Sequence, residues 1–277
     1  QHIPHVKESA EKPKQERPQL FPYPIREENF QPAPLISARS AIVIDSKTGV
    51  SLYEKEPTLH HLPASTAKLM TALVALEKCQ PEKIVTVTYL DPNPTQMGLA
   101  LGDVLSINTL LHGLLITSGN DAAYALAYAC ANSPEEFVNQ MNLKAKELKM
   151  NDTVFTNPTG YDNPGEYTTA KDLARLAKVA VSNPLIAKIV ATQNILLQNE
   201  SNTKSYNLTN INRLLGMVPG VEGIKTGQTA GSLEILITKT VRDNKEVIAV
   251  VLGSTDRFAD STTLIEWTFN NFSWVNP

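Results

Sequence analysis

The chain has 277 residues, which is enough to bury a sizeable core as one large domain or two small ones. Its composition, 42% hydrophobic and 19% charged, is that of an ordinary soluble globular protein. Twenty-five basic and 28 acidic residues leave a formal net charge of -3, so the basic excess typical of nucleic-acid binders is missing. We therefore expect no nucleic-acid partner.

The sequence contains no apolar run close to the roughly 20 residues of a membrane span, and no signal peptide. Because it begins at Gln1 rather than at a methionine, we expect a mature or trimmed form that has lost its targeting segment. The two cysteines, Cys79 and Cys130, match no metal-ligand spacing and no CxxC motif. Each lies in or beside an apolar helical stretch, which predicts two buried small hydrophobic residues rather than a disulfide.

Residues 1–37 differ in composition from the rest of the chain, because prolines alternate with charged and polar residues. Such a segment buries too little apolar surface to offset its ordering entropy, so we expect an extended tail or linker. It could be a spacer that holds the folded part away from a membrane, or a tail without function. We expect residues 38–277 to form the folded domain, with no additional β-rich domain at the C-terminus.

The folded part opens with two short strands, 41–45 and 50–55, around a Ser-Lys-Thr-Gly turn that predicts a hairpin. Periodic apolar residues then predict a series of helices, at 62–78, 102–117, 121–131, 133–150 and 168–182. We expect Thr168 or Thr169 to cap the last of these.

The final third is rich in β-branched residues and predicts antiparallel strands at 221–226, 232–241 and 245–254, followed by a helix at 259–271. Strands at both ends around a helical middle indicate an α+β fold, with the first hairpin joining the late strands in one sheet.

Three short polar motifs interrupt these apolar elements. The first, Ser65-Thr66-Ala67-Lys68, places a serine at a helix start and a lysine one turn later. The backbone N–H of such a serine lies at the positive end of the helix dipole, and a lysine with a lowered pKa could take the proton of the hydroxyl. The alternative is a serine cap followed by a lysine whose charged end reaches solvent. The apolar residues around Lys68 favour the catalytic interpretation.

The second motif, Ser118-Gly119-Asn120, is a polar break between two apolar helical runs, and the third, Lys225-Thr226-Gly227, ends a strand. Taken alone, the second motif would be interpreted as a plain helix–helix turn. The third, taken alone, is also consistent with an exposed edge-strand lysine. Ser-x-x-Lys, Ser-x-Asn and Lys-Thr-Gly in this order are the signature of the penicillin-recognising serine acyl-transferases.

The stretches around the motifs resemble one particular family within this group of enzymes. The segments LPASTAKLMTALVALE, LLHGLLITSGNDAAYALA, FTNPTGYDNPGEYTTAKDLARLA and GIKTGQTAGSLEILITKTVRDNKEVIAVVLGSTDRF resemble the low-molecular-mass D-alanyl-D-alanine carboxypeptidases, from about residue 38 to 272. The resemblance implies a β-lactamase/transpeptidase-like fold, in which an antiparallel sheet and a mostly helical subdomain enclose the active site. It implies a peptidoglycan stem peptide ending in D-Ala-D-Ala as substrate and β-lactam antibiotics as covalent inhibitors.

The resemblance also assigns roles, motif by motif. Ser65 corresponds to the nucleophile, Lys68 to its base, Ser118 to a proton relay and Asn120 to the amide that orients the substrate backbone. The charge of Lys225 is expected to help lower the pKa of Lys68. The groups implied in holding the substrate's terminal carboxylate and the oxyanion lie on or beside the last strands: Lys225, Thr226, Gly227, Gln228 and Arg257.

The sequence departs from the family at two places. The stretch 228–231 is shorter than the usual turn after Lys-Thr-Gly, and Glu234 replaces a residue that is more often apolar or small, so we expect it to face solvent. Three activities remain open: a carboxypeptidase that removes the terminal D-Ala, an endopeptidase that cuts peptidoglycan cross-links, and a serine β-lactamase. The last is disfavoured because Glu166 lacks an asparagine four residues later, where Ala170 stands.

The resemblance implies an enzyme that works outside the cytoplasmic membrane, in the periplasm or on the outer membrane face, with any membrane tether outside this segment. It calls for no metal and no organic cofactor, because serine, lysine and backbone donors suffice for acyl transfer.

Overall fold

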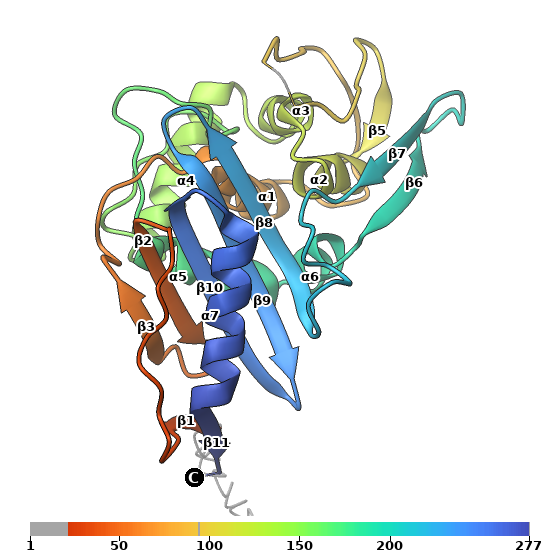
Figure 1. Cartoon of the computed structure of the whole chain (residues 1–277). Coiled ribbons are helices and arrows are strands. Elements are labelled where there is room, and N and C mark those ends of the chain that lie inside the picture. Colours follow the sequence, from red (N-terminus) through yellow and green to blue (C-terminus); the bar gives the residue numbers. More distant parts are fainter. Residues whose placement is uncertain (1–21, 94, 277) are drawn as a thin grey trace, which may run out of the picture.

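The computed structural model describes residues 22–93 and 95–276 (Figure 1). Its centre is a five-stranded antiparallel sheet in the order β3-β2-β10-β9-β8. The bounds of these strands are Ser40–Asp45 for β2, Ser51–Lys55 for β3, Val221–Thr229 for β8, Leu233–Arg242 for β9 and Lys245–Ser254 for β10. The predicted pairing of the N-terminal hairpin with the late strands is therefore confirmed, through β2 and β10.

Both faces of the sheet are covered, and alternate residues of each strand serve different cores. Val247, Ala249 and Val251 of β10 pack with the C-terminal helix α7 (Arg257–Asn271), whereas Ile248 and Val250 join the larger core. Figure 1 shows α7 lying across one face, with α1 (Lys68–Lys78) and α5 (Ala170–Ser182) behind the sheet. This two-sided burial explains why the late strands are almost continuously apolar.

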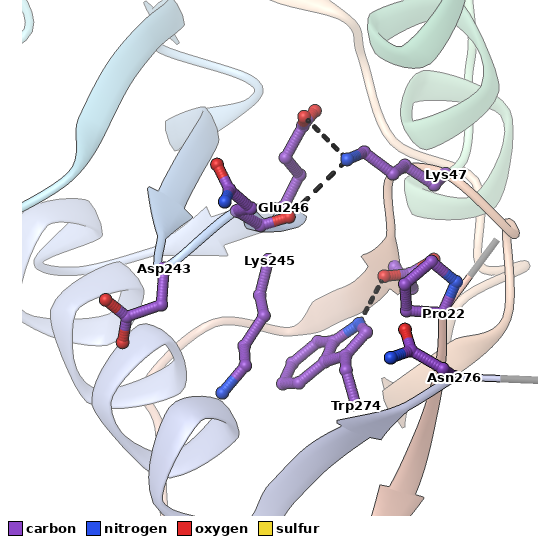
Figure 2. A pocket seen from close by; sticks show the side chains of 9 residues that line it. Pro22, Lys47, Asp243, Lys245, Glu246, Trp274 and Asn276 are labelled. Carbon is purple, nitrogen blue, oxygen red and sulfur yellow. Dashed lines mark hydrogen bonds and ion pairs between the residues drawn. The ribbon is translucent and has the colours of Figure 1, made fainter.

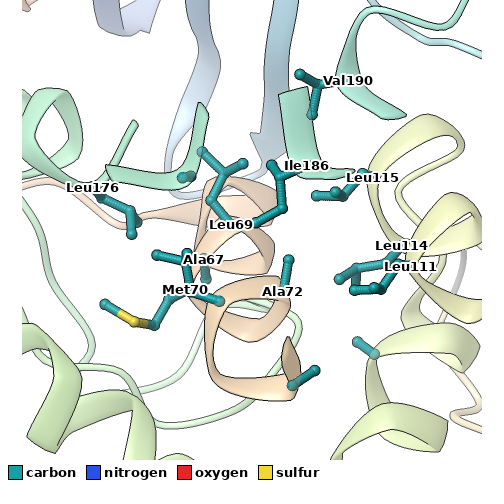
Figure 3. Packing of buried hydrophobic residues seen from close by; sticks show 14 of the residues in the cluster. Ala67, Leu69, Met70, Ala72, Leu111, Leu114, Leu115, Leu176, Ile186 and Val190 are labelled. Carbon is teal, nitrogen blue, oxygen red and sulfur yellow. The ribbon is translucent and has the colours of Figure 1, made fainter. Parts of the chain in front are cut away.

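The larger core is helical and centres on α1 (Lys68–Lys78), which follows a 3₁₀ turn, η1 (Ala64–Ala67). In Figure 3, Leu69 and Ala72 of α1 lie among Leu111 and Leu114 of α2 (Ile107–Ile116) and Ile186 of α6 (Pro184–Val190). The remaining helices are α2 (Ile107–Ile116), α3 (Asn120–Cys130), α4 (Pro134–Glu147), α5 (Ala170–Ser182) and α6 (Pro184–Val190). The side chain of Thr169 accepts a hydrogen bond from the N–H of Asp172, so the predicted cap of α5 is confirmed.

Two small two-stranded sheets flank the helices, and neither was predicted from the sequence. They pair β4 (Ile84–Thr86) with β5 (Val104–Ser106), and β6 (Asn194–Gln198) with β7 (Ser205–Thr209). No helix within residues 22–93 and 95–276 has the length and apolar character needed to cross a membrane.

Part of the expected N-terminal tail belongs to the folded unit. Residues 1–21 lie outside the described residues, but β1 (Tyr23–Arg26) pairs with β11 (Phe272–Val275), and Phe30 packs edge-on against Trp267. The indole N–H of Trp267 donates to the carbonyl of Pro32 at 2.9 Å. The two ends of the described chain thus hold each other, a long-range contact that local composition does not reveal.

The expectation of two unpaired cysteines is wrong, because Cys79 and Cys130 form a disulfide. Cys79 follows the last residue of α1 and Cys130 ends α3, so the two helices bring residues 51 apart in sequence together. Spacing alone could not show this, since the pairing depends on how α1 and α3 pack. The bridge links the helix that follows the first motif to the helix that follows the second.

We expect loss of this bridge to lower the free energy of unfolding by about 2–4 kcal/mol, because it closes a long loop in the unfolded chain. Thermal and denaturant unfolding of the wild type, with and without a reductant, would measure the effect. The Cys79→Ser/Cys130→Ser double variant should show the lowered stability under both conditions. Equal stability of the oxidised wild type and the double variant would contradict the prediction.

Candidate active site

The first motif forms a compact serine–lysine pair. Ser65 lies in η1 and Lys68 is the first residue of α1, so both side chains project from the same turn. Lys68 Nζ lies 2.9 Å from Ser65 Oγ and donates at 2.9 Å to the carbonyl of Thr159. The lysine side chain is fully buried, and Ser65 does not cap the helix with its hydroxyl. The interpretation as a cap followed by a solvated lysine is therefore wrong.

Burial lowers the pKa of Lys68 to about 7, because the charged ammonium loses its hydration. The negative charges of Asp91, Asp121 and Glu166 act in the opposite direction and limit the shift. Lys225 was expected to help lower this pKa, but its charge is not among the causes of the shift, and burial alone lowers the value. Near neutral pH the amine is thus free of its extra proton for part of the time, as a base requires.

The second and third motifs meet at a second buried lysine. Lys225 Nζ lies 2.8 Å from Ser118 Oγ and 3.0 Å from the carbonyl of Thr226. Burial lowers the pKa of Lys225 well below its ordinary value, and repulsion from Lys68 and Arg257 lowers it further. Ser118 has a backbone φ of 63°, a left-handed conformation that is uncommon for a residue with a side chain. Strained backbone of this kind is frequent where a side chain must be aimed at a site.

Strand β8 passes unusually close to the serine. A Cβ atom at Gly227 would lie 3.1 Å from the Cβ of Ala64 and 3.3 Å from the backbone nitrogen of Ser65. Since β8 is at the edge of the sheet, its outer side is unpaired within the five strands and faces η1. The glycine therefore allows the close approach that a shared anion site between η1 and β8 would need.

Arg257, the first residue of α7, reaches back to the same strand. Its Nη1 donates to the carbonyl of Gly227 at 2.8 Å, so the guanidinium lies directly behind the third motif. Glu234 was expected to face solvent, but its Oε2 accepts the backbone N–H of Arg257 at 3.0 Å. Burial lowers the pKa of Arg257, and the charge of Glu234 opposes that shift. Glu234 thus anchors the start of α7 beside the site.

A cavity of about 270 Å³ opens in front of these groups. Of the predicted site residues, Ser65, Asn120 and Gln228 line it, while Lys68, Ser118 and Lys225 are buried outside its lining. Three other segments complete the lining of the cavity. They are the loop between β4 and β5, the loop after Pro158 and the end of β8 with the turn that follows, and they contribute, in that order, Thr95; Thr159, Gly160, Tyr161 and Asp162; and Thr229 and Ala230.

A second cavity, of about 290 Å³, lies near the β1–β11 pair and contains none of the predicted site residues (Figure 2). Its polar groups bind one another. Trp274 donates its indole N–H to Asp45 at 2.7 Å, and Lys47 forms an ion pair with Glu246 at 3.5 Å. The cavity at Ser65 is therefore the candidate site.

Two residues that support the site were not singled out from the sequence. The side-chain oxygen of Asn157 accepts the N–H groups of Thr159, Gly160 and Tyr161 at 2.8–3.1 Å, and so fixes the loop whose carbonyl binds Lys68. The buried carboxylate of Asp121 accepts the N–H groups of residues 97, 98 and 99 at 2.9–3.0 Å. Both lie in stretches that carried the family resemblance, which was the available signal.

The pattern of a known family covers most of the chain. It is the family described as D-alanyl-D-alanine carboxypeptidase (Peptidase_S11), and it matches residues 27–256. The chain belongs to this family. It is 36% identical over 245 residues to the D-alanyl-D-alanine carboxypeptidase DacF of Bacillus subtilis, which covers 85% of this chain and 63% of the relative.

Two further relatives show the range of the family. The D-alanyl-D-alanine carboxypeptidase DacC of Escherichia coli is 36% identical over 262 residues, covering 88% of this chain and 64% of that protein. The D-alanyl-D-alanine endopeptidase of the same organism is 31% identical over 242 residues, covering 84% and 78%. The chain therefore spans somewhat less than two thirds of the two carboxypeptidases named here.

Solved structures agree with the fold. The crystal structure of the Streptomyces K15 DD-transpeptidase matches 87% of this chain and all of that chain, with a TM-score of 0.80 and 30% identity. The penicillin-binding protein homologue Rv2911 of Mycobacterium tuberculosis covers 89% and 96%, with a TM-score of 0.81 and 29% identity. The expected α+β, transpeptidase-like fold is therefore confirmed.

The buried amine predicts how reactivity depends on pH. Because Lys68 accepts a proton only when neutral, we expect acylation of Ser65 by benzylpenicillin to rise with pH around an apparent pKa near 7. Stopped-flow measurement of the second-order acylation rate would give the profile. Lys68→Ala should abolish acylation while leaving the fold intact, because the variant lacks the amine that takes the proton of Ser65. Acylation of that variant at the parent rate would exclude Lys68 as the base.

Proposed function

We propose that this chain is a serine D-alanyl-D-alanine carboxypeptidase that removes the terminal D-alanine of peptidoglycan stem pentapeptides. The observation that carries the proposal is the 2.9 Å contact between Ser65 Oγ and the buried Nζ of Lys68, at the wall of an open cavity. Family membership supports this reaction class, in which a hydroxyl is activated by an adjacent amine.

In the first half of the reaction, Ser65 Oγ attacks the carbonyl carbon of the penultimate D-alanine while its proton passes to Lys68. The negative charge that develops on the carbonyl oxygen is stabilised by the backbone N–H groups of Ser65 and Gln228. The C–N bond then breaks, and the leaving amine receives a proton through Ser118. Free D-alanine departs and the peptide remains on Ser65 as an ester.

In the second half, a water molecule attacks that ester while Lys68 again takes the proton. The Ser65 Oγ–carbon bond breaks, the shortened peptide leaves with a new carboxylate, and the serine recovers its hydrogen. The groups that carry these steps all belong to this chain. Asn120 lines the cavity beside Ser65, where its amide would orient the peptide backbone during both halves.

Substrate binding uses the outer side of β8. An extended peptide can pair with an edge strand through main-chain hydrogen bonds, which would place its terminal carboxylate near the Lys-Thr-Gly end. Arg257 lies behind that end and Thr226 is within it. A bound carboxylate would also favour the ammonium form of Lys225, which burial disfavours in its absence. Substrate binding and the charge of Lys225 are thereby coupled.

An endopeptidase is the second candidate, because the peptidoglycan cross-link it would cut also follows a D-alanine carbonyl. The endopeptidase relative of Escherichia coli supports it, although the two relatives with the highest identity named above are carboxypeptidases. A β-lactamase is the weaker alternative, because Ala170, and not an asparagine, stands four residues after Glu166. We expect β-lactams to act as slowly released inhibitors.

The same proposal places the protein outside the cytoplasmic membrane, where its peptidoglycan substrate lies. The disulfide between Cys79 and Cys130 supports this location, since disulfides persist mainly in oxidising compartments. A membrane tether in a segment beyond this chain would be compatible with the same site.

The central experiment is mass spectrometry after incubation with benzylpenicillin. We expect one covalent adduct on Ser65 that decays slowly and is absent from Ser65→Ala. An unmodified wild type, or an adduct that survives the substitution, would refute the acyl-enzyme. Intact cell-wall fragments then separate the two peptidase activities. Release of free D-alanine supports the carboxypeptidase, and conversion of dimers to monomers supports the endopeptidase.

Arg257 gives a second test, directed at substrate binding. Arg257→Gln should raise the KM for a D-Ala-D-Ala peptide about 10- to 100-fold, because a charged hydrogen bond contributes about 1.5–3 kcal/mol. Arg213 is a matched control, since it also lies over the ring of Phe258 but is exposed. Arg213→Gln should leave KM unchanged. Equal KM values for both variants would remove Arg257 from the carboxylate site.

A further inference from the structure

The cavity at Ser65 has one charged wall that the proposed mechanism does not use. Among the described residues that line the cavity, Asp162 is the only one with a charged side chain. No ion pair within residues 22–93 and 95–276 includes Asp162, and its Oδ1 is enclosed without a hydrogen-bond partner there. An enclosed carboxylate without a counter-charge is costly, so a cation bound in the cavity would stabilise it.

The turn after β8 holds Asp162 at one end of the cavity. Asp162 Oδ2 accepts the N–H of Gly231 at 3.1 Å, and a Cβ atom at Gly231 would lie 2.9 Å from that oxygen. The glycine thus lets the turn pack directly on the carboxylate. The turn is itself closed by the N–H of Thr229, which donates to Ser232 Oγ at 2.9 Å. The carboxylate therefore has a defined position relative to the end of β8.

The positive groups of the site lie on the other side of the nucleophile. Arg257 Nη1 donates to the carbonyl of Gly227 at 2.8 Å, and Lys225 precedes that glycine by two residues in β8. Gly227 also marks the level of the nucleophile, since a Cβ atom there would lie 3.3 Å from the backbone nitrogen of Ser65. The order along β8 is therefore positive groups, nucleophile and then Asp162.

A peptide paired with the outer side of β8 follows the same order. Its terminal carboxylate lies at the positive groups and its penultimate carbonyl faces Ser65, so the preceding residue extends toward the turn at 229–231. Each residue of an extended chain rises about 3.3 Å, which places this third residue about 7 Å from the terminal one. The charged group on that side of the cavity is Asp162.

We propose that Asp162 is a specificity-determining residue, which selects stem peptides with an ammonium group on the side chain of the residue before the two D-alanines. Such a peptide has a negative terminus and a positive side chain two residues earlier, which matches the polarity of the site. The two charges attract more strongly in a partly enclosed cavity than in bulk water. The proposal rests on the proposed function, because it names the substrates of the same site.

Two peptides that differ by one acetyl group test the preference. Nα-acetyl-L-lysyl-D-alanyl-D-alanine keeps the side-chain ammonium, whereas the Nα,Nε-diacetyl peptide lacks it. We expect the wild-type kcat/KM for release of D-alanine to be about tenfold higher for the first peptide. This ratio should shrink as the salt concentration rises toward about 1 M, because salt screens the attraction. Equal kcat/KM values at low salt would overturn the proposal.

Asp162→Asn separates recognition of charge from a structural role. The amide oxygen of asparagine can still accept the N–H of Gly231, but the negative charge is gone. We expect this variant to lose the preference for the free amine. Glu200 is an exposed carboxylate, and Glu200→Gln should keep the wild-type ratio. An Asp162→Asn variant that is slower toward both peptides but retains the tenfold ratio would show that Asp162 only braces the loop, and would overturn the proposal.

The proposed function and the substrate preference fail in different ways. If neither peptide releases D-alanine and Ser65 forms no penicillin adduct, the proposed function fails. If both peptides are hydrolysed at the same rate, the function stands and the preference fails. Calorimetry with Ser65→Ala measures the preference without hydrolysis. A Kd about tenfold lower for the free-amine peptide supports the role of Asp162, and equal Kd values refute it.

Discussion

The burial of one amine constrains the rest of this structure. Lys68 is enclosed by the helical core, and its Nζ donates to the Ser65 hydroxyl and the Thr159 carbonyl. Removing an ammonium from water is costly, and the protein limits the cost by letting the group lose its proton. The neutral amine still needs hydrogen-bond partners, and these are the Ser65 hydroxyl and the Thr159 carbonyl. The η1 turn, α1 and the 157–160 loop must therefore be positioned together.

The two halves of the molecule each contribute one buried lysine to the site. Lys68 comes from the helical core, whereas Lys225 comes from the edge strand β8 and binds Ser118 of the helical half. This cross-contact joins sheet and helices at the point where the cavity opens. The disulfide from Cys79 to Cys130 ties α1 to α3 further along, so the helices that follow Ser65 and Ser118 cannot separate. Packing, covalent linkage and the site thus reinforce one arrangement.

Much of this arrangement could be predicted from the sequence, because its determinants are local or ordered along the chain. Apolar periodicity located the main helices and sheet strands. The three motifs, in a fixed order, located the serines and the two buried lysines of the site. The disulfide and the β1–β11 pairing were not predictable, since each joins segments whose proximity depends on tertiary packing. The role of Glu234 was missed for the same reason: its partner is a backbone N–H that the start of α7 brings to it.

The carboxyl groups near Lys68 show why its environment is not simply apolar. Asp121 accepts three backbone N–H groups, and its negative charge favours the ammonium form of the lysine. A purely apolar pocket would lower the pKa further and yield a weaker base, whereas additional fixed anions would leave the amine protonated. A value near 7 results from burial acting against a limited number of negative charges. The pKa of Lys68 is therefore set by the negative charges around it as well as by its burial.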